Sequence, residues 1–210
     1  MHNQPLDLRE VYRAIINAYP ANASPPQLPE RTGSPEYNAY RDAFTSVIES
    51  VPSTPGVYLW FARKDTRRTE FIYVGESQRQ GLHERFRKEF SNWHHCFWAT
   101  AFHTDKYLPE ALNIYVESAR YQPKKAKYTN SICNDWLKRD ATHLVYRTGL
   151  SKAIDLKFLQ NDLIQLFGNP RGNLADIRAV PFRQEKMLPI SKSVYEEVLS
   201  LTHKAQIYEP

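Results

Sequence analysis

Cysteine is scarce in this chain, and long apolar runs are absent. Its 210 residues include only two cysteines, Cys96 and Cys133, which lie far apart and outside any CxxC pair. A disulfide-stabilised scaffold or a structural zinc site needs more ligands at closer spacing, so we expect two reduced thiols. No run approaches the roughly 18 apolar residues that a membrane-spanning helix requires, so no membrane partner is expected.

The first residues also lack a targeting signal. Residues 1–5 contain no basic stretch followed by an apolar one, so the sequence predicts no secretory signal and a cytoplasmic location. Apolar side chains, by contrast, make up 41% of the chain and aromatic ones 13%, which is enough for a core. The length suits one domain with additions.

Positive charge exceeds negative charge, with 28 Lys and Arg against 23 Asp and Glu. The basic residues gather in three clusters with aromatic side chains among them, at 63–68, 79–88 and 124–127. This distribution is compatible with a polyanionic partner such as nucleic acid. Solvated surface loops would explain each cluster equally well, so charge alone does not decide.

The spacing of apolar residues predicts an alternation of strands and helices. Five helices are predicted from apolar residues at helical spacing, and their predicted starts are Asp7, Ser34, Gly81, Ser151 and Ser193. Aromatic and β-branched runs predict strands at 56–61, 71–74 and 144–147, the first two joined as a hairpin. This order predicts an α/β (α+β) fold: a small mixed three-stranded sheet flanked by helices, with helical additions at both ends.

Both strands of the predicted hairpin carry short motifs. Gly56-Val57-Tyr58 in the first strand and Tyr73-Val74-Gly75 in the second resemble the two halves of the GIY-YIG nuclease signature. The helix that follows presents Arg85 at the place of that family's catalytic arginine. Tripeptides of this kind are common, so the resemblance depends on the elements that follow them.

The later part of the chain continues the resemblance. Residues 159–164 (LQNDLI), followed by Pro170 and Asn173, are similar to the closing helix of the GIY-YIG family. The resemblance covers residues 54–174, with an insert at about 91–141 outside it. Residues 1–53 are then a helical N-terminal decoration, and residues 175–210 a C-terminal extension with one helix.

The resemblance implies a metal-dependent DNA endonuclease that hydrolyses phosphodiester bonds. Tyr58 and Tyr73 would project toward the phosphate, and Arg85 would donate paired hydrogen bonds to its oxygens. A phenol, whose pKa is ordinarily about 10, needs positive charge or a metal nearby to act as a base. One divalent ion, usually Mg²⁺, would be held by the acid that the family has at position 160. A freestanding chain of this size resembles a site-specific restriction-type enzyme acting on double-stranded DNA, and cutting both strands favours a homodimer.

The chain departs from the family at three positions. The metal-binding acid falls on Gln160, which predicts that this chain is impaired, because a neutral amide binds divalent metals poorly. The Tyr or His expected one helical turn after Arg85 falls on Glu89, which is not an equivalent. Asn173 lies one residue later than usual.

Three interpretations of Gln160 remain open at this point. It lies within about 60° of Leu156 and Leu163 on the helix, so it could be a hydrogen-bonded core glutamine. It could be an engineered replacement of Glu, made to trap an uncleaved complex. It could also mark a degenerate domain that binds nucleic acid without cutting. Asp155 and Asp162 point to the other side of the helix and cannot supply the missing carboxylate.

Further residues are candidates for contacts with nucleic acid. These are Gly75, Arg79, Arg87, His94, His95, Lys124, Lys125 and Asn173. His94 and His95 could supply a general base, or simply pack beside Trp93 and Trp98. A basic interaction protein that merely shares the fold is the third class of function compatible with the sequence.

Overall fold

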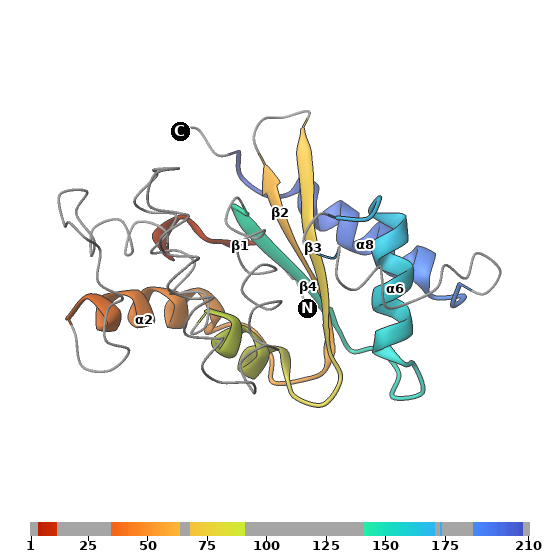
Figure 1. Cartoon of the computed structure of the whole chain (residues 1–210), viewed down its shortest axis with the longest axis horizontal. Helices are drawn as coiled ribbons and strands as arrows, with labels where there is room; N and C mark the ends of the chain where they lie inside the picture. The colour runs from red at the N-terminus through yellow and green to blue at the C-terminus, as the bar shows by residue number, and fades with distance from the viewer. Residues whose placement is uncertain are drawn as a thin grey trace, which may run out of the picture.

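The computed structural model describes residues 4–11, 35–63, 68–90, 141–170, 173 and 187–207 (Figure 1). Almost all of the predicted insert at 91–141 lies outside the described residues. So do four of the predicted nucleic-acid contacts: His94, His95, Lys124 and Lys125.

A sheet forms the centre of the described part of the chain, in which it has four strands. They are β1 (Leu6–Asp7), β2 (Gly56–Arg63), β3 (Thr69–Ser77) and β4 (His143–Thr148), in the spatial order β1-β4-β2-β3. Every pairing is antiparallel. An α+β class is therefore confirmed, whereas the predicted count of three strands and the mixed sheet are wrong. The extra strand is β1, which is too short for a periodic pattern and forms by pairing with β4.

Asp7 has a second role besides its place in β1. Its carboxylate accepts a hydrogen bond from the backbone N–H of Arg9 at 2.9 Å, where residues 9–11 are helical. The predicted N-capping side chain is thus present, although Asp7 also pairs with His143 of β4. Asp7 can end a strand and start a helix because its backbone groups pair with β4, whereas its side-chain carboxylate caps the helix.

The predicted hairpin is formed by β2 and β3. Tyr58 lies opposite Gly75, and Trp60 lies opposite Tyr73, after which a register shift brings Phe61 opposite Phe71. β2 is buried along almost its whole length because β3 and β4 flank it and helices cover both of its faces. Its near-continuous apolar run is the consequence of this central position.

The helices lie on both faces of the sheet. In Figure 1, α2 (Pro35–Ile48) and the yellow-green helix of residues 82–90 lie on one side, and α6 (Leu156–Leu166) and α8 (Ser191–His203) lie on the other. Tyr58 and Trp60 belong to the first apolar core, whereas Val57 and Leu59 belong to the second. Alternation along β2 therefore decides which helices each residue meets.

The two predicted additions take part in these cores. Tyr40 and Phe44 of α2 are buried with the first core, and Val194 and Val198 of α8 are buried with the second. The segments predicted as decoration thus cover the sheet that carries the candidate site.

Two predicted helix starts are wrong. α6 is capped by Asp155, whose carboxylate accepts from the N–H groups of Lys157 and Phe158, and not by Ser151. α8 begins at Ser191 rather than after Ser193; its N-cap is Ile190, and no side chain caps it. The Ser191 hydroxyl donates to buried Asp162 of α6 at 2.6 Å. The first turn of α8 is thus joined to α6 by this contact between helices.

The predicted end of α6 is confirmed. Gly168 and Asn169 both have positive φ, at 75° and 56°, directly after the capping residue Phe167. Among the helices that the structure describes, none is long and apolar enough to cross a membrane.

Candidate active site

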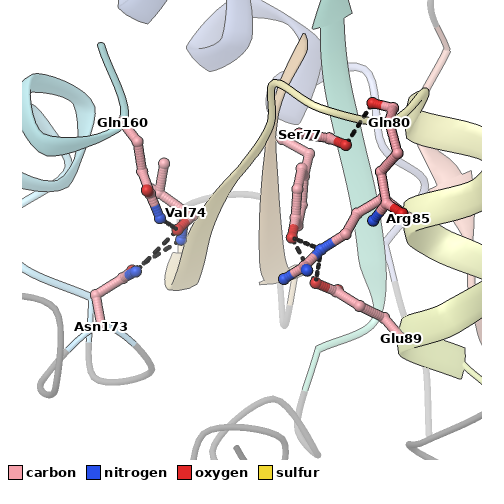
Figure 2. Close-up of polar contacts among 8 residues, drawn as sticks. Val74, Ser77, Gln80, Arg85, Glu89, Gln160 and Asn173 are labelled. Carbon is pink, nitrogen blue, oxygen red and sulfur yellow. Dashed lines mark hydrogen bonds and ion pairs between the residues drawn. The ribbon is translucent and has the colours of Figure 1, made fainter. Parts of the chain in front are cut away.

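Three polar side chains meet on the face of the sheet that the helix of residues 82–90 covers. The Tyr58 hydroxyl donates a hydrogen bond to Oε1 of Glu89 at 2.5 Å and accepts one from Nε of Arg85 at 3.0 Å. The Arg85 Nε also lies 2.8 Å from Oε1 of Glu89, an ion pair visible in Figure 2. We refer to these residues as the Tyr58–Arg85–Glu89 cluster.

Helical spacing and packing place Arg85 and Glu89 together. They are four positions apart, so they lie on neighbouring turns of one helix face. Leu82, Phe86 and Phe90 of the same helix are fully buried against the sheet. Phe86 meets the Tyr58 ring edge-on at 5.0 Å between centroids, which brings the phenol within reach of the two charged groups.

Gly75 allows the Tyr58 ring to lie where it does. A Cβ atom at this position would overlap the Tyr58 ring and its hydroxyl. Because Gly75 lies opposite Tyr58 in the hairpin, the missing side chain leaves room for the phenol to cross the neighbouring strand. The last residue of the Tyr73-Val74-Gly75 motif is therefore explained by close packing.

Tyr73 lies beside the cluster. Its ring centroid is 6.1 Å from that of Tyr58, and both residues are buried in the same core. The structure therefore brings together the two tyrosines and the arginine that the sequence singled out.

Burial and charge set the protonation states in the cluster. Burial, followed by the negative charge of Glu89, raises the pKa of Tyr58 well above its ordinary value, and the opposing effect of Arg85 is smaller. Glu89 and Tyr58 also raise the pKa of Arg85 above its ordinary value. At neutral pH the phenol thus keeps its proton and the guanidinium keeps its charge.

Gln160 lies apart from the cluster. It belongs to α6, on the other face of the sheet, is 6% exposed, and donates from Nε2 to the backbone oxygen of Val74 at 3.0 Å (Figure 2). Gln160 is thus a hydrogen-bonded core glutamine, one of the three interpretations open from the sequence.

Asn173 meets the same peptide group as Gln160. Its Nδ2 donates to the Val74 oxygen at 2.8 Å, and the Val74 N–H donates to its Oδ1 at 2.8 Å. Asn173 is fully buried, and its amide pairs with the outer edge of β3 as a neighbouring strand would. In this arrangement its side chain is inaccessible to nucleic acid.

The residues at the predicted magnesium position do not fit a divalent cation. Gln160 is neutral, and its amide is already directed at Val74. Glu89 is paired with Arg85 and Tyr58. Within the described part of the chain, no three His, Cys, Asp or Glu side chains come together in a way that could hold a metal.

The remaining described candidates are Arg79 and Arg87. Arg79 is exposed in the turn between β3 and the helix of residues 82–90. Arg87 is exposed on that helix and pairs with Glu84 at 3.0 Å, on a different side from Arg85 because two positions correspond to about 200°.

Glu89 is the member of the cluster that the sequence interpretation missed. A signal was available, because Glu89 lies seven positions after Leu82 and three after Phe86, on the apolar side of the helix. A carboxylate at a buried helical position needs a partner, and Arg85 one turn earlier supplies it.

Comparisons with protein-family models, with curated proteins and with solved structures find no match to this chain.

Proposed function

We propose that this chain is a GIY-YIG-type endonuclease that hydrolyses phosphodiester bonds in double-stranded DNA. The observation that carries the proposal is the convergence of Tyr58, Tyr73 and Arg85 from β2, β3 and the helix of residues 82–90. These three elements follow one another in the chain, and their packing gathers a guanidinium and two phenols at one place.

The chemistry of the cluster suits a phosphodiester. The side chain of Arg85 is 35% exposed, so its outer end is accessible to an anion while its inner end is held. A guanidinium stabilises the negative charge that develops on phosphate oxygens as the bond to the leaving oxygen breaks. The Tyr58 hydroxyl fixes the guanidinium by accepting from Nε, and Tyr73 is the remaining phenol beside them.

Site-specific, restriction-type cleavage by a homodimer belongs to the same proposal. The homodimer rests on the need to cut two strands. Because the Gln160 side chain does not fit the Mg²⁺ ion that the resemblance implies, no step of the proposal passes through a metal.

Plasmid cleavage tests the proposal. Supercoiled DNA is incubated with the wild type, with Arg85→Ala and with Gln160→Glu, each with Mg²⁺ and with EDTA. We expect slow nicking by the wild type and a rate lower by about a hundred- to a thousandfold for Arg85→Ala. Mg²⁺-dependent acceleration in Gln160→Glu would show that a carboxylate at position 160 reaches the substrate although the amide there does not touch the cluster. The carboxylate of Gln160→Glu can turn away from the Val74 oxygen because Asn173 still donates to that oxygen. Lys88→Ala, which removes an exposed charge from the same helix, is the matched control. If neither the wild type nor Gln160→Glu cuts DNA with any divalent metal, the endonuclease proposal fails.

A second candidate function is nucleic-acid binding without cleavage. The bond between Gln160 and Val74 favours it, because that amide serves the packing of α6 on β3 and not a metal. This candidate predicts DNA binding that weakens steeply with salt and is lost in Arg85→Ala, while Gln160→Glu stays unable to cut.

A further inference from the structure

Glu89 and Asp162 are the two buried acidic residues in the described part of the chain, and Glu89 is the one that contacts Tyr58 and Arg85. Its side chain is 9% exposed, against 35% for Arg85. A buried carboxylate is costly unless it is paired and hydrogen-bonded. Here a single oxygen, Oε1, accepts from both the Tyr58 hydroxyl and the Arg85 Nε.

The contact uses only one end of the guanidinium. Nε is the nitrogen nearest the side-chain stem, and Arg85 contacts both Tyr58 and Glu89 through it. Among the described residues, no hydrogen bond involves the two terminal nitrogens of Arg85. The stem is thus held between Glu89 and Tyr58, while the fork that matches two phosphate oxygens is directed away from them.

We propose that Glu89 is a positioning residue, which orients the Arg85 fork toward a phosphodiester and keeps Tyr58 as a hydrogen-bond donor. The inference rests on the proposed function and deepens it. It assigns Tyr58 to the support of Arg85, and it leaves Tyr73 as the phenol that meets the attacking water. Glu89 compensates for nothing at position 160, since it lies on the other face of the sheet.

Positioning by an anion has a kinetic consequence that a purely structural role lacks. The negative charge of Glu89 opposes the approach of phosphate while its contact orients the arginine. Glu89→Gln should therefore bind DNA about two- to tenfold more tightly at low salt. Cleavage should nevertheless slow by about a hundredfold, because a misplaced guanidinium stabilises the transition state poorly.

The first test separates binding from cleavage. DNA affinity and cleavage rate are measured for Glu89→Gln in the wild-type and Gln160→Glu backgrounds. Tighter binding with slower cleavage supports the proposal. A parallel loss of both, or no change in either, overturns it. Should Glu89→Gln fail to fold, Glu89→Asp keeps the charge but withdraws the oxygen, so cleavage should fall with affinity unchanged; wild-type cleavage by that variant overturns the proposal.

The second test needs no substrate, so it distinguishes failure of this inference from failure of the proposed function. Tyrosinate absorbance is titrated in the wild type and in Glu89→Gln, each compared with the same chain carrying Tyr58→Phe. Because the charge of Glu89 raises the pKa of Tyr58, that phenol should ionise at lower pH in Glu89→Gln. Glu84→Gln, whose side chain is exposed on the same helix, should leave the Tyr58 titration unchanged. An unshifted Tyr58 in Glu89→Gln overturns the inference even if the wild type cuts DNA. A shifted Tyr58 in a chain that neither binds nor cuts DNA upholds the contact and refutes the function.

Discussion

Two polar groups lie on the two sides of β3, and they differ in charge and in what they bind. The Tyr58–Arg85–Glu89 cluster is ionic, and its arginine is partly exposed. The group of Gln160, Asn173 and Val74 consists of neutral amides that saturate one backbone peptide. Adjacent residues of the Tyr73-Val74-Gly75 segment contribute to both groups: Gly75 gives room to Tyr58, whereas the Val74 peptide group bonds to the two amides. A motif position thus shows where a residue lies without showing what it does.

The largest difference between the two polar groups is expected for a substitution at Arg85. Arg85→Ala should lower cleavage by about a hundred- to a thousandfold, because the donor to the phosphate is removed. It also removes the Arg85 cation from the buried Glu89 carboxylate, so the free energy of unfolding should fall by about 1–3 kcal/mol. Plasmid nicking and urea unfolding measure the two effects. Cleavage within twofold of the wild type would contradict the assignment of the site.

The largest effect on the neutral side should come from Asn173→Ala. It removes both partners of the Val74 peptide that Asn173 supplies, which should cost about 2–4 kcal/mol of unfolding free energy. Because no charge is involved, the loss should be the same at low and high salt, in contrast to Arg85→Ala.

A variant with an ionisable side chain at position 173 tests whether this residue donates to the Val74 oxygen. In Asn173→Asp the carboxyl group can donate to the Val74 oxygen only when it holds a proton, so burial raises its folded pKa. Its stabilising contribution is present below the unfolded pKa and is lost as pH rises through the folded value. The variant should consequently be closer to wild-type stability at pH 4 than at pH 7. A loss that is independent of pH would show that the side chain turns away from Val74.

Gly75→Ala tests the position in β3 that lies between the Val74 peptide group and the Tyr58 ring. The added Cβ meets the Tyr58 ring, so the hairpin or the phenol must shift, at about 1–3 kcal/mol. A double-mutant cycle with Tyr58→Ala should recover most of this cost, since the clash is with that ring. Additive effects in thermal unfolding would mean that the strain lies elsewhere in β3.

The smallest effect is expected for Gln160→Leu. The Val74 oxygen keeps its bond from Asn173, so only one of two donors is lost, at about 0.5–1.5 kcal/mol. DNA affinity should stay unchanged, because position 160 does not touch the cluster. If DNA affinity instead fell more than threefold while stability stayed unchanged, Gln160 would have to be part of the DNA-binding site.

The sequence predicted the elements that carry their own periodic pattern. The hairpin, the helix bearing Arg85, and α6 with its Gly168-Asn169 ending all follow from the spacing of apolar residues and from turn chemistry. β1 was missed because two residues define no period. The start of α6 was misplaced because Ser151 and Asp155 are both capping residue types, and that of α8 because its N-cap, Ile190, is not one. Glu89 was set aside because it did not match the family pattern, although its helical position marked it as buried.

By itself the sequence determined that Arg85 and Glu89 share a helix face and that Tyr58 and Tyr73 stand on neighbouring strands, because these relations depend on spacing within a helix or a hairpin. Only the tertiary structure decided that Tyr58 completes the pair of charged groups, and that the amide of Gln160 ends on Val74. Those contacts join residues 31 and 86 positions apart, respectively. The local sequence pattern indicates which face of a helix or strand is buried. The residues that this face contacts depend on how the helices and strands pack in the tertiary structure.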